Sequence, residues 1–309
     1  MSDDKRKSTL EKTAEAVAAG AAAGAAAYAG VCWYIFQNAF DSRHASLSGI
    51  GQMMRGDETW LNSSAVADEW ITSFDGISLH ASRVINHRDS HRWVIAVPGY
   101  LQSGLSLLQV LHQFDEDGYN LLALDNRASG KSAGIHTGLG WPEHYDLISW
   151  INYLINLDHD ARIVLYGFGM GGTAVLNATG EYLPRAVRCA IEDGGYSGIR
   201  EILAEAIRQR WKFSGTAFLR GIDFFVSRQL HFSIYKANTL TLLGQSTTPT
   251  LFIHGDSDST VPSSMMFDCY YACASAKELC SVKGADHACT VNDPLYFKAI
   301  GSFLDKYMI

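Results

Sequence analysis

Two kinds of segment alternate along most of this chain. Short runs of β-branched and aliphatic residues are typical of buried strands, and longer segments with apolar residues at helical spacing separate them. The strand-like runs are residues 92–97, 121–125, 162–166, 250–253 and 278–282, and a terminal helix is expected over 296–307. Strands that alternate with helices predict an α/β fold with a mostly parallel central sheet and helices on both faces.

One interval is too long for this alternation. About 55 residues separate the strand-like run that ends at Asp193 from the next one, which starts at Thr250, whereas such connections usually have roughly 2–6 residues. Apolar residues at helical spacing predict two helices there, over 199–211 and 216–230, so residues 194–248 are expected to form a helical cap. Four of its phenylalanines are candidates for lining a pocket: Phe213, Phe218, Phe224 and Phe225.

The N-terminal region has a different pattern. Residues 16–40 contain no charged side chain, and as a helix they would extend about 37 Å, enough for a hydrocarbon core of roughly 30 Å. A cleaved signal peptide is the rival interpretation, because Ala25–Ala27 offers small residues for cleavage. The aromatic run from Val31 to Phe36 favours an uncleaved transmembrane anchor over 16–40.

Charge around this segment predicts its orientation. Four basic residues precede it, whereas Arg43 alone follows closely, so residues 1–15 are expected to be cytoplasmic. A connector over 41–64 would then lead to a domain over 65–309 outside the cytoplasm, which gives a single-pass cell-membrane protein. Gly20 and Gly24 form a small-xxx-small pattern that could pair two helices in a dimer, a weak signal in an alanine-rich run.

Composition narrows the classes of function. A chain of 309 residues with 47% hydrophobic residues can fill one α/β core beside the anchor. The net charge of −7 and the lack of basic patches interleaved with aromatics argue against nucleic-acid binding. Of six cysteines, Cys32 lies in the anchor, and the others lack the paired spacing of a zinc site. We expect no metal and no cofactor, while a disulfide in the domain stays open.

The most informative motif is the stretch Gly167–Gly172, between a strand-like run and a predicted helix. A strand, a tight glycine turn and a helix form the turn that presents a hydrolase nucleophile, and the next backbone N–H contributes to the oxyanion hole. Gly169 occupies the nucleophile position, and the N–H belongs to Met170. A dinucleotide-binding turn is the weaker alternative, because no acidic residue ends a second strand at the usual distance.

Further motifs extend this pattern in both directions. Asp258 lies in an acidic loop after one strand and His287 follows the next, which is the chain order nucleophile, acid, histidine of these enzymes. Upstream, residues 98–104 follow a buried strand at the position of the oxyanion loop, so Tyr100 would supply the second N–H. The segment 130–132 is no phosphate loop, because that motif needs a glycine where Asp125 stands.

From about Asp75 to its end, the chain resembles bacterial membrane-anchored α/β-hydrolases of the serine aminopeptidase or prolyl-oligopeptidase-like group. The segments that carry the resemblance are residues 125–134, 140–146, 147–154, 191–196 and 249–262. It implies an α/β-hydrolase fold and a serine hydrolase of esters or peptides, with a serine at the place of Gly169. Relatives also begin the oxyanion loop with histidine-glycine, where this chain has Pro98.

Glycine at this position removes the chemistry of a serine hydrolase. It offers no oxygen, no proton and no covalent intermediate. The first hypothesis is therefore an impaired, membrane-tethered protein that binds a small ester, acyl or peptide ligand, or a partner. The alternative is an active hydrolase that uses water held by His287 or another nucleophile, for which Ser103, Ser197 and Cys289 are weak candidates. Asp193 is a weak candidate to replace Asp258 as the acid.

Overall fold

A single sheet of eight strands organises the domain in the computed structural model, which describes residues 2–45, 58–212 and 214–308, with residues 2–17 as helix backbone only. The strands are β1 (Val66–Thr72), β2 (Ser78–Val84), β3 (Arg92–Val97), β4 (Asn120–Leu124), β5 (Arg162–Phe168), β6 (Val187–Asp193), β7 (Thr250–Gly255) and β8 (Lys277–Val282). All five expected strand-like runs lie in these strands, offset from them by one or two residues at most.

The order of strands brings the predicted site residues to one edge. It is β1-β2-β4-β3-β5-β6-β7-β8. Only the two pairs that include β2 are antiparallel, and the others are parallel. In a parallel sheet the carboxyl ends of neighbouring strands meet at one edge, where ligands bind. The loops after β3, β5, β7 and β8 therefore face one another.

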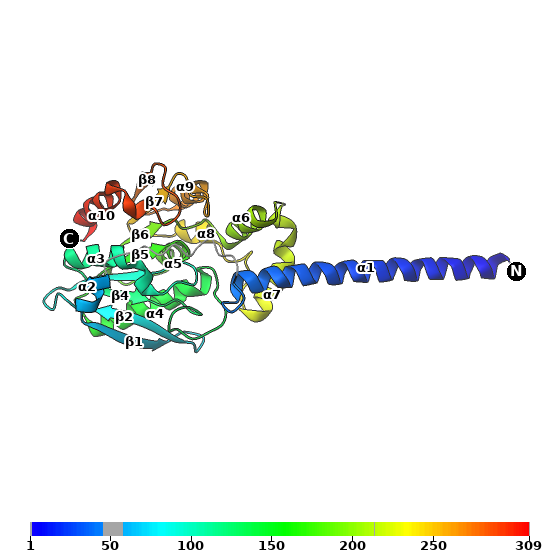
Figure 1. The fold of residues 1–309 in the computed structure, drawn as a ribbon, viewed down its shortest axis with the longest axis horizontal. Helices are drawn as coiled ribbons and strands as arrows, with labels where there is room; N and C mark the ends of the chain where they lie inside the picture. The colour runs from blue at the N-terminus through cyan, green and yellow to red at the C-terminus, as the bar shows by residue number, and fades with distance from the viewer. Residues whose placement is uncertain (1, 46–57, 213, 309) are drawn as a thin grey trace.

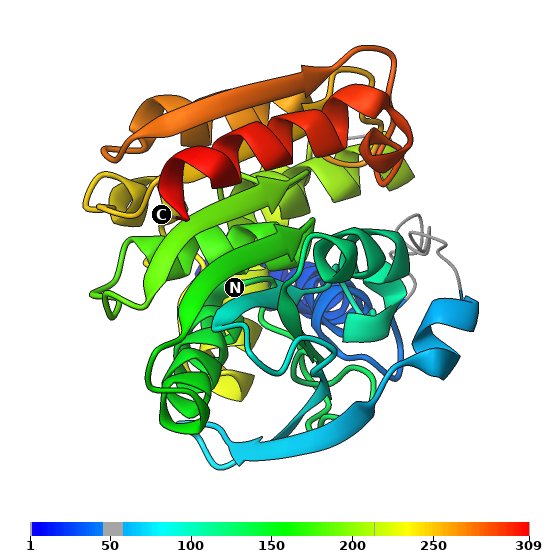
Figure 2. The same cartoon turned by 90° about the vertical axis from the view of Figure 1, so that its left-hand side faces the viewer.

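Helices cover both faces of this sheet (Figure 2). On one face lie α3 (Leu108–Glu116) and α10 (Pro294–Tyr307), whose apolar side chains share a core with β3 to β8. On the other lie α4 (Trp141–Leu157), α5 (Met170–Thr179), α8 (Thr239–Leu243) and α9 (Ser263–Ala272). The predicted α/β architecture with a mostly parallel sheet is confirmed.

The interval between β6 and β7 carries its own helices. The first, α6 (Ile199–Trp211), has the expected bounds, whereas the second expected helix is divided into η2 (Gly215–Phe218) and α7 (Leu219–Gln229). The last helix of the interval, α8, packs against α5 and α9 instead. We use the name cap for α6, η2 and α7.

The N-terminal helix α1 (Ser2–Phe40) extends away from the domain (Figure 1). Residues Ala18–Phe40 are long and apolar enough to cross a membrane, by length and composition. Ala18 to Val31 are exposed, but Cys32, Phe36 and Phe40 are fully buried. The last nine residues of the expected anchor thus pack against protein, since hydropathy alone does not distinguish a lipid neighbour from an apolar protein neighbour.

This buried end of α1 shares an apolar cluster with the cap and with the loops after β3 and β5. Phe36, Tyr100, Met170 and Ile222 all belong to that cluster. Two phenylalanines that were candidates for lining a pocket contact α1 instead of the glycine turn: Phe218 stacks on Tyr28 at 5.7 Å, and Phe225 meets Trp33 at 5.1 Å between ring centroids. Phe224 is exposed, and Phe213 lies outside the described residues.

The expected connector is integrated into the domain at both described ends. Asp41 is buried, forms an ion pair with Arg43 and pairs its backbone with His136. At the other end, α2 (Glu58–Ser63) places Trp60 so that its indole N–H donates to Asp115. Residues 46–57 lie outside the described chain. All six cysteines are free thiols, so the structure contains no disulfide.

Candidate active site

The glycine turn joins β5 directly to α5. Gly169 stands between Phe168, the last residue of β5, and Met170, the first of α5, with φ +54° and ψ −115°. This positive φ is a conformation that residues with a Cβ atom adopt only at a cost. Close contacts explain a second glycine, because a Cβ on Gly171 would lie 2.1 Å from the carbonyl oxygen of Val97. The turn is therefore packed tightly against the end of β3.

The loops after β7 and β8 bring an acid and a histidine together. The Nδ1 atom of His287 lies 2.8 Å from Oδ2 of Asp258. Asp258 is fixed in turn by backbone N–H groups of Thr260 and Val261, each 2.8 Å from its Oδ1. Because an ionised carboxylate only accepts hydrogen bonds, Nδ1 is the donor and Nε2 of the neutral ring is free to accept.

The predicted nucleophile position faces this histidine. A Cβ atom on Gly169 would lie 3.4 Å from Nε2 of His287, with Cε1 at 3.6 Å and Cα of Gly99 at 4.0 Å as its next neighbours. A serine side chain would thus place its hydroxyl beside the atom that accepts a proton in a catalytic triad. The structure brings Gly169, Asp258 and His287 together in this arrangement, with no oxygen at the first position.

Two backbone N–H groups flank the same space. Within the described chain, neither the N–H of Tyr100 nor that of Met170 donates a hydrogen bond to another protein atom. Met170 starts α5, where backbone donors are unpaired and the helix dipole is positive. Tyr100 belongs to the loop after β3, and its hydroxyl donates to the carbonyl oxygen of Ala39 at 2.9 Å. The predicted oxyanion donors are thus both available.

A second histidine shares the acid, and the sequence analysis missed it. Nε2 of His254 lies 3.2 Å from Oδ2 of Asp258 and 2.9 Å from the carbonyl oxygen of Val261. Burial alone would raise the pKa of Asp258, but hydrogen bonds from His254 and His287 hold it well below its usual range. The sequence did contain a signal for His254, because this histidine lies near the end of a buried strand and four residues before Asp258.

Glu192 is a fully buried carboxyl group that interacts electrostatically with His254. Burial raises the pKa of Glu192 to about 7, and the nearby charge of His254 opposes that increase. One oxygen of Glu192 accepts the N–H of Gly195 at 2.8 Å, and the other has no partner among the described residues. For His254, burial lowers the pKa, but Asp258 and Glu192 outweigh it and raise the pKa above its usual value.

Asp193 interacts electrostatically with His287, but its hydrogen bonds are formed with other residues. Asp193 accepts hydrogen bonds from Tyr296 at 2.9 Å and from Thr290 at 3.1 Å, and burial raises its pKa to about 6. The carboxylate bonded to His287 is that of Asp258. No hydrogen bond joins the hydroxyl group of Ser103 or of Ser197 to His287 in the described part of the chain. Geometry therefore favours none of these substitutes.

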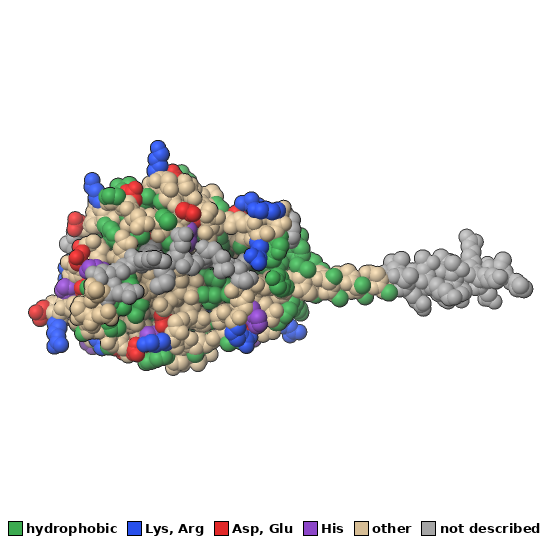
Figure 3. Space-filling model, viewed as in Figure 1, with side chains coloured by type: hydrophobic (Ala, Val, Ile, Leu, Met, Phe, Trp, Pro, Cys, Tyr) green, Lys and Arg blue, Asp and Glu red, His purple; other side chains and the backbone are tan. Residues whose placement is uncertain are grey.

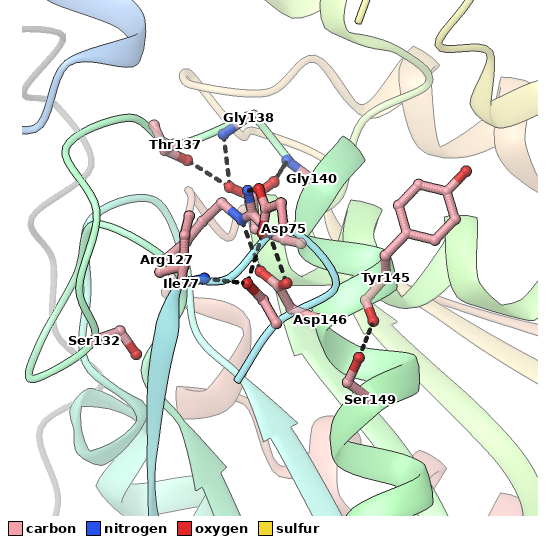
Figure 4. A network of polar contacts seen from close by, with 12 residues as sticks. Asp75, Ile77, Arg127, Ser132, Thr137, Gly138, Gly140, Tyr145, Asp146 and Ser149 are labelled. Carbon is pink, nitrogen blue, oxygen red and sulfur yellow. Dashed lines mark hydrogen bonds and ion pairs between the residues drawn. The ribbon is translucent and has the colours of Figure 1, made fainter. Parts of the chain in front are cut away.

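The loop after β4 supports the oxyanion loop. Asn126 donates to the carbonyl oxygen of Pro98 at 3.0 Å, and Asp125 accepts the N–H of Gly104 at 2.9 Å. Arg127 binds Asp146 and Asp75 together, with its Nε 2.7 Å from Asp146 and its Nη1 2.9 Å from Asp75 (Figure 4). This buried network fixes the segment whose sequence resembles the hydrolase loop.

The adjoining turn is held by a second buried carboxylate. Glu143 accepts the hydroxyl of Thr137 at 2.9 Å and the N–H groups of Gly138 and Gly140 at 2.6 and 2.9 Å, contacts that Figure 4 also shows. Gly140 in turn lies against the start of α5, because a Cβ there would be 3.2 Å from the carbonyl oxygen of Met170. Both networks therefore hold the backbone around the glycine turn.

Comparison with known proteins identifies the fold. A family model described as Serine aminopeptidase, S33, matches residues 88–215. The Pyrococcus furiosus esterase Pf2001 superposes with a TM-score of 0.67 at 24% identity, covering 82% of this chain and 96% of that one. The domain has the α/β-hydrolase fold. Est1E from Butyrivibrio proteoclasticus, solved with ferulic acid bound, also aligns, with a TM-score of 0.60 at 18% identity over 78% of this chain and 99% of that one.

One curated sequence supports the same relationship. The protein YqkD of Bacillus subtilis (strain 168), described as uncharacterized, is 27% identical over 239 residues, which cover 76% of this chain and 78% of that protein. The chain therefore has the α/β-hydrolase fold, and its residues 88–215 match the serine aminopeptidase family model. The family match includes the glycine turn but ends before Asp258 and His287, whose roles rest on geometry. Among the described residues, no group of His, Cys, Asp and Glu could hold a metal ion.

Proposed function

We propose that this chain is a catalytically impaired α/β-hydrolase-fold protein that binds an acyl or peptide ligand in the site around Gly169. One observation carries the proposal. A Cβ atom on Gly169 would lie 3.4 Å from Nε2 of His287, where a nucleophile is expected, but glycine has no hydroxyl group. A serine hydrolase needs that oxygen to form its acyl intermediate.

The remaining groups suit the recognition of a carbonyl or carboxylate. Among the described residues, the N–H groups of Tyr100 and Met170 have no protein acceptor, and Nε2 of His287 lies near the backbone of Gly169. In an active relative such donors stabilise the developing oxyanion. Without a nucleophile they can still bind an oxygen of the ligand, and His287 can add a hydrogen bond when protonated.

Tethering to a membrane is the second part of the proposal. The exposed part of α1 is apolar, and the basic residues that precede it favour a cytoplasmic N-terminus, with the hydrolase-like domain outside. Protease added to intact cells should then digest the C-terminal domain. Full protection, together with a cytoplasmic signal from a reporter fused to the C-terminus, would contradict this orientation.

An active hydrolase remains the alternative, because the pair formed by His287 and Asp258 is complete. In that case a water molecule beside Gly169 would give its proton to Nε2 of His287 as its oxygen attacks the ester carbonyl. The leaving group would then take that proton, and the acid and the alcohol would be released. No covalent bond to the protein would form at any step.

Labelling and turnover distinguish these cases. The full chain in detergent should be treated with a fluorophosphonate and assayed with an activated ester, beside a His287→Ala variant. Neither labelling nor turnover above the variant is expected for the impaired protein. Turnover that depends on His287 without labelling would establish the water mechanism. Stoichiometric labelling of a serine near His287 would show another nucleophile and overturn the proposal.

A further inference from the structure

The place where α1 leaves the domain is surrounded by exposed aromatic and basic side chains. We call this surface the cap rim, formed by Tyr28, Trp33 and Tyr34 of α1 and by Arg220, Phe224 and Arg228 of α7. We propose that the cap rim lies in the headgroup region of a bilayer containing anionic lipids, so that the domain is seated on the membrane instead of swinging on a tether. This inference rests on the proposed membrane attachment of α1.

The length of α1 is the first argument. Its uncharged segment begins at Ala16, and its burial in the domain begins at Cys32. The 16 residues from Ala16 to Val31 extend about 24 Å, roughly 6 Å less than a typical hydrocarbon core. About one more helical turn must therefore enter the apolar region. That turn carries Trp33 and Tyr34, so the cap packed against it has to approach the lipid as well.

The second argument is the chemistry of the exposed side chains. Phe224 is 58% exposed and Tyr34 is 50% exposed, although both belong to helices with buried apolar faces. Tryptophan and tyrosine are enriched at membrane–water interfaces, where their apolar rings and polar atoms have matching surroundings. Figure 3 shows hydrophobic side chains gathered around the base of α1. Exposure of these clustered apolar rings to water is unfavourable, and a membrane–water interface would bury them.

Charge provides the third argument. Residues 194–248 contain seven lysines and arginines and three acidic residues, a net charge of +4, whereas the whole chain carries −7, so all other residues together carry −11. The guanidinium of Arg228 lies 5.8 Å from the centre of the Phe224 ring. In the described part of the chain, neither Arg220 nor Arg228 forms an ion pair with a carboxylate. A basic surface beside exposed aromatics complements anionic headgroups.

The rigid contact between α1 and α7 fixes the rim relative to the membrane segment. The two helices approach so closely that a Cβ on Gly221 would lie 2.9 Å from the ring of Tyr28, and Tyr28 donates a hydrogen bond to the carbonyl oxygen of Ala217. A second protein copy bound to the rim would also have to accommodate the apolar helix that emerges from it. A bilayer accepts both surfaces at once, which favours lipid as the occupant.

Spin labels at two exposed aromatic positions test the proposal. The full chain is reconstituted in vesicles of phosphatidylcholine and phosphatidylglycerol, with a nitroxide on Phe224→Cys or, as the matched control, on Tyr182→Cys, which is 94% exposed and distant from the cap in sequence. Background labelling of the six native cysteines is measured on the parent chain and subtracted. The measured quantity is the ratio of the label's collision rate with oxygen to its collision rate with a water-soluble nickel chelate. This ratio should be several-fold higher for the label at 224 than for the control label at 182. The Arg220→Gln, Arg228→Gln double variant should reduce this difference.

Each other outcome has a distinct meaning. If the chain floats with vesicles but both labels are equally accessible to nickel, the rim is in water and this inference is wrong, while the tether proposal stands. If the chain does not float with vesicles, both proposals fail. Spin–spin broadening of the label at 224 that persists at a high lipid-to-protein ratio would identify a second copy as the occupant and overturn the lipid assignment.

Discussion

The two sides of the candidate site differ in what they retain. On the side of the C-terminal loops, Asp258 and His287 are hydrogen-bonded at 2.8 Å, and the acid holds two further backbone N–H groups. On the side of the glycine turn, the backbone conformation and the close contact of Gly171 with β3 are present, but Gly169 has no functional group. The arrangement thus resembles that of a serine hydrolase site, with glycine where the serine is expected.

The two sides are held in place by different interactions. The glycine turn is determined by backbone packing, and a glycine at its centre lowers strain, so its shape persists without any chemistry. The pair of Asp258 and His287 is part of a buried polar network that includes His254 and Glu192. Removing a member of such a network leaves buried polar groups unpaired. Retention of the pair is thus explained by stability as well as by catalysis.

The largest effect is expected from adding the missing oxygen. Gly169→Ser should raise the rate of ester hydrolysis above that of the parent chain, by up to about 10⁶-fold if the geometry is fully competent, which is the loss measured when a comparable serine is removed. Activity should disappear in the Gly169→Ser, His287→Ala double variant. Gly169→Ala is the matched control, because it has the Cβ atom without the hydroxyl. A folded Gly169→Ser protein without turnover would show that the two sides no longer fit.

Removing the acid should have the largest effect on stability. Asp258→Ala leaves His254 and His287 without their shared partner, and a broken buried pair costs about 3–5 kcal/mol of the free energy of unfolding. Denaturant unfolding of the full chain in detergent measures it. Asp286→Ala, which removes hydrogen bonds from Ser259 and from the N–H of His287 but leaves Asp258 in place, should cost clearly less. Equal losses would argue against the network as the reason for retention.

A smaller loss is expected from Gly169→Ala. The positive φ of Gly169 should make the alanine variant about 1–3 kcal/mol less stable. Gly284→Ala measures the cost of the backbone conformation alone. Gly284 has φ +73°, and a Cβ atom there would have no described neighbour within 4 Å. The loss at 169 should equal or exceed that at 284, because the new Cβ also meets His287 at 3.4 Å. No measurable loss at 169 would remove the strain argument.

The last prediction concerns pH. A carboxyl group whose pKa is higher in the folded than in the unfolded chain binds its proton more tightly when folded, so stability falls as pH rises through the interval. For Glu192 that interval runs from 4.5 to about 7. The decline amounts to a few kcal/mol at most, at about 1.4 kcal/mol per pKa unit. Glu192→Gln should flatten unfolding stability between pH 5 and 8, whereas Glu116→Gln at an exposed position should not.

Much of the fold was predictable because its signals are local. The runs that became β3, β5 and β7 are rich in apolar residues in lengths that suit buried strands, and α6 has a clear helical period. The burial of the end of α1 was not predictable, because the aromatic residues from Val31 to Phe36 suit a lipid interface and a protein core equally well. The same ambiguity affected Phe218 and Phe225, whose partner proved to be α1.

The site was predictable to the level of positions in a motif. Sequence order placed Gly169, Asp258 and His287 on the loops after β5, β7 and β8, and the parallel topology brings such loops together. The proximity of Glu192 to His254 was not predictable, because it arises between strands β6 and β7, not along the chain. The catalytic and oxyanion roles themselves stay predictions until the variants are measured.

The hydroxyl of Tyr100 gives the domain a mechanical property. It donates to the carbonyl oxygen of Ala39 at the end of α1, while the backbone of the same residue belongs to the loop beside Gly169. If α1 is embedded in a membrane as proposed, a force along α1 would act on this loop through that hydrogen bond. The distance over which such a force must be transmitted is a single tyrosine side chain.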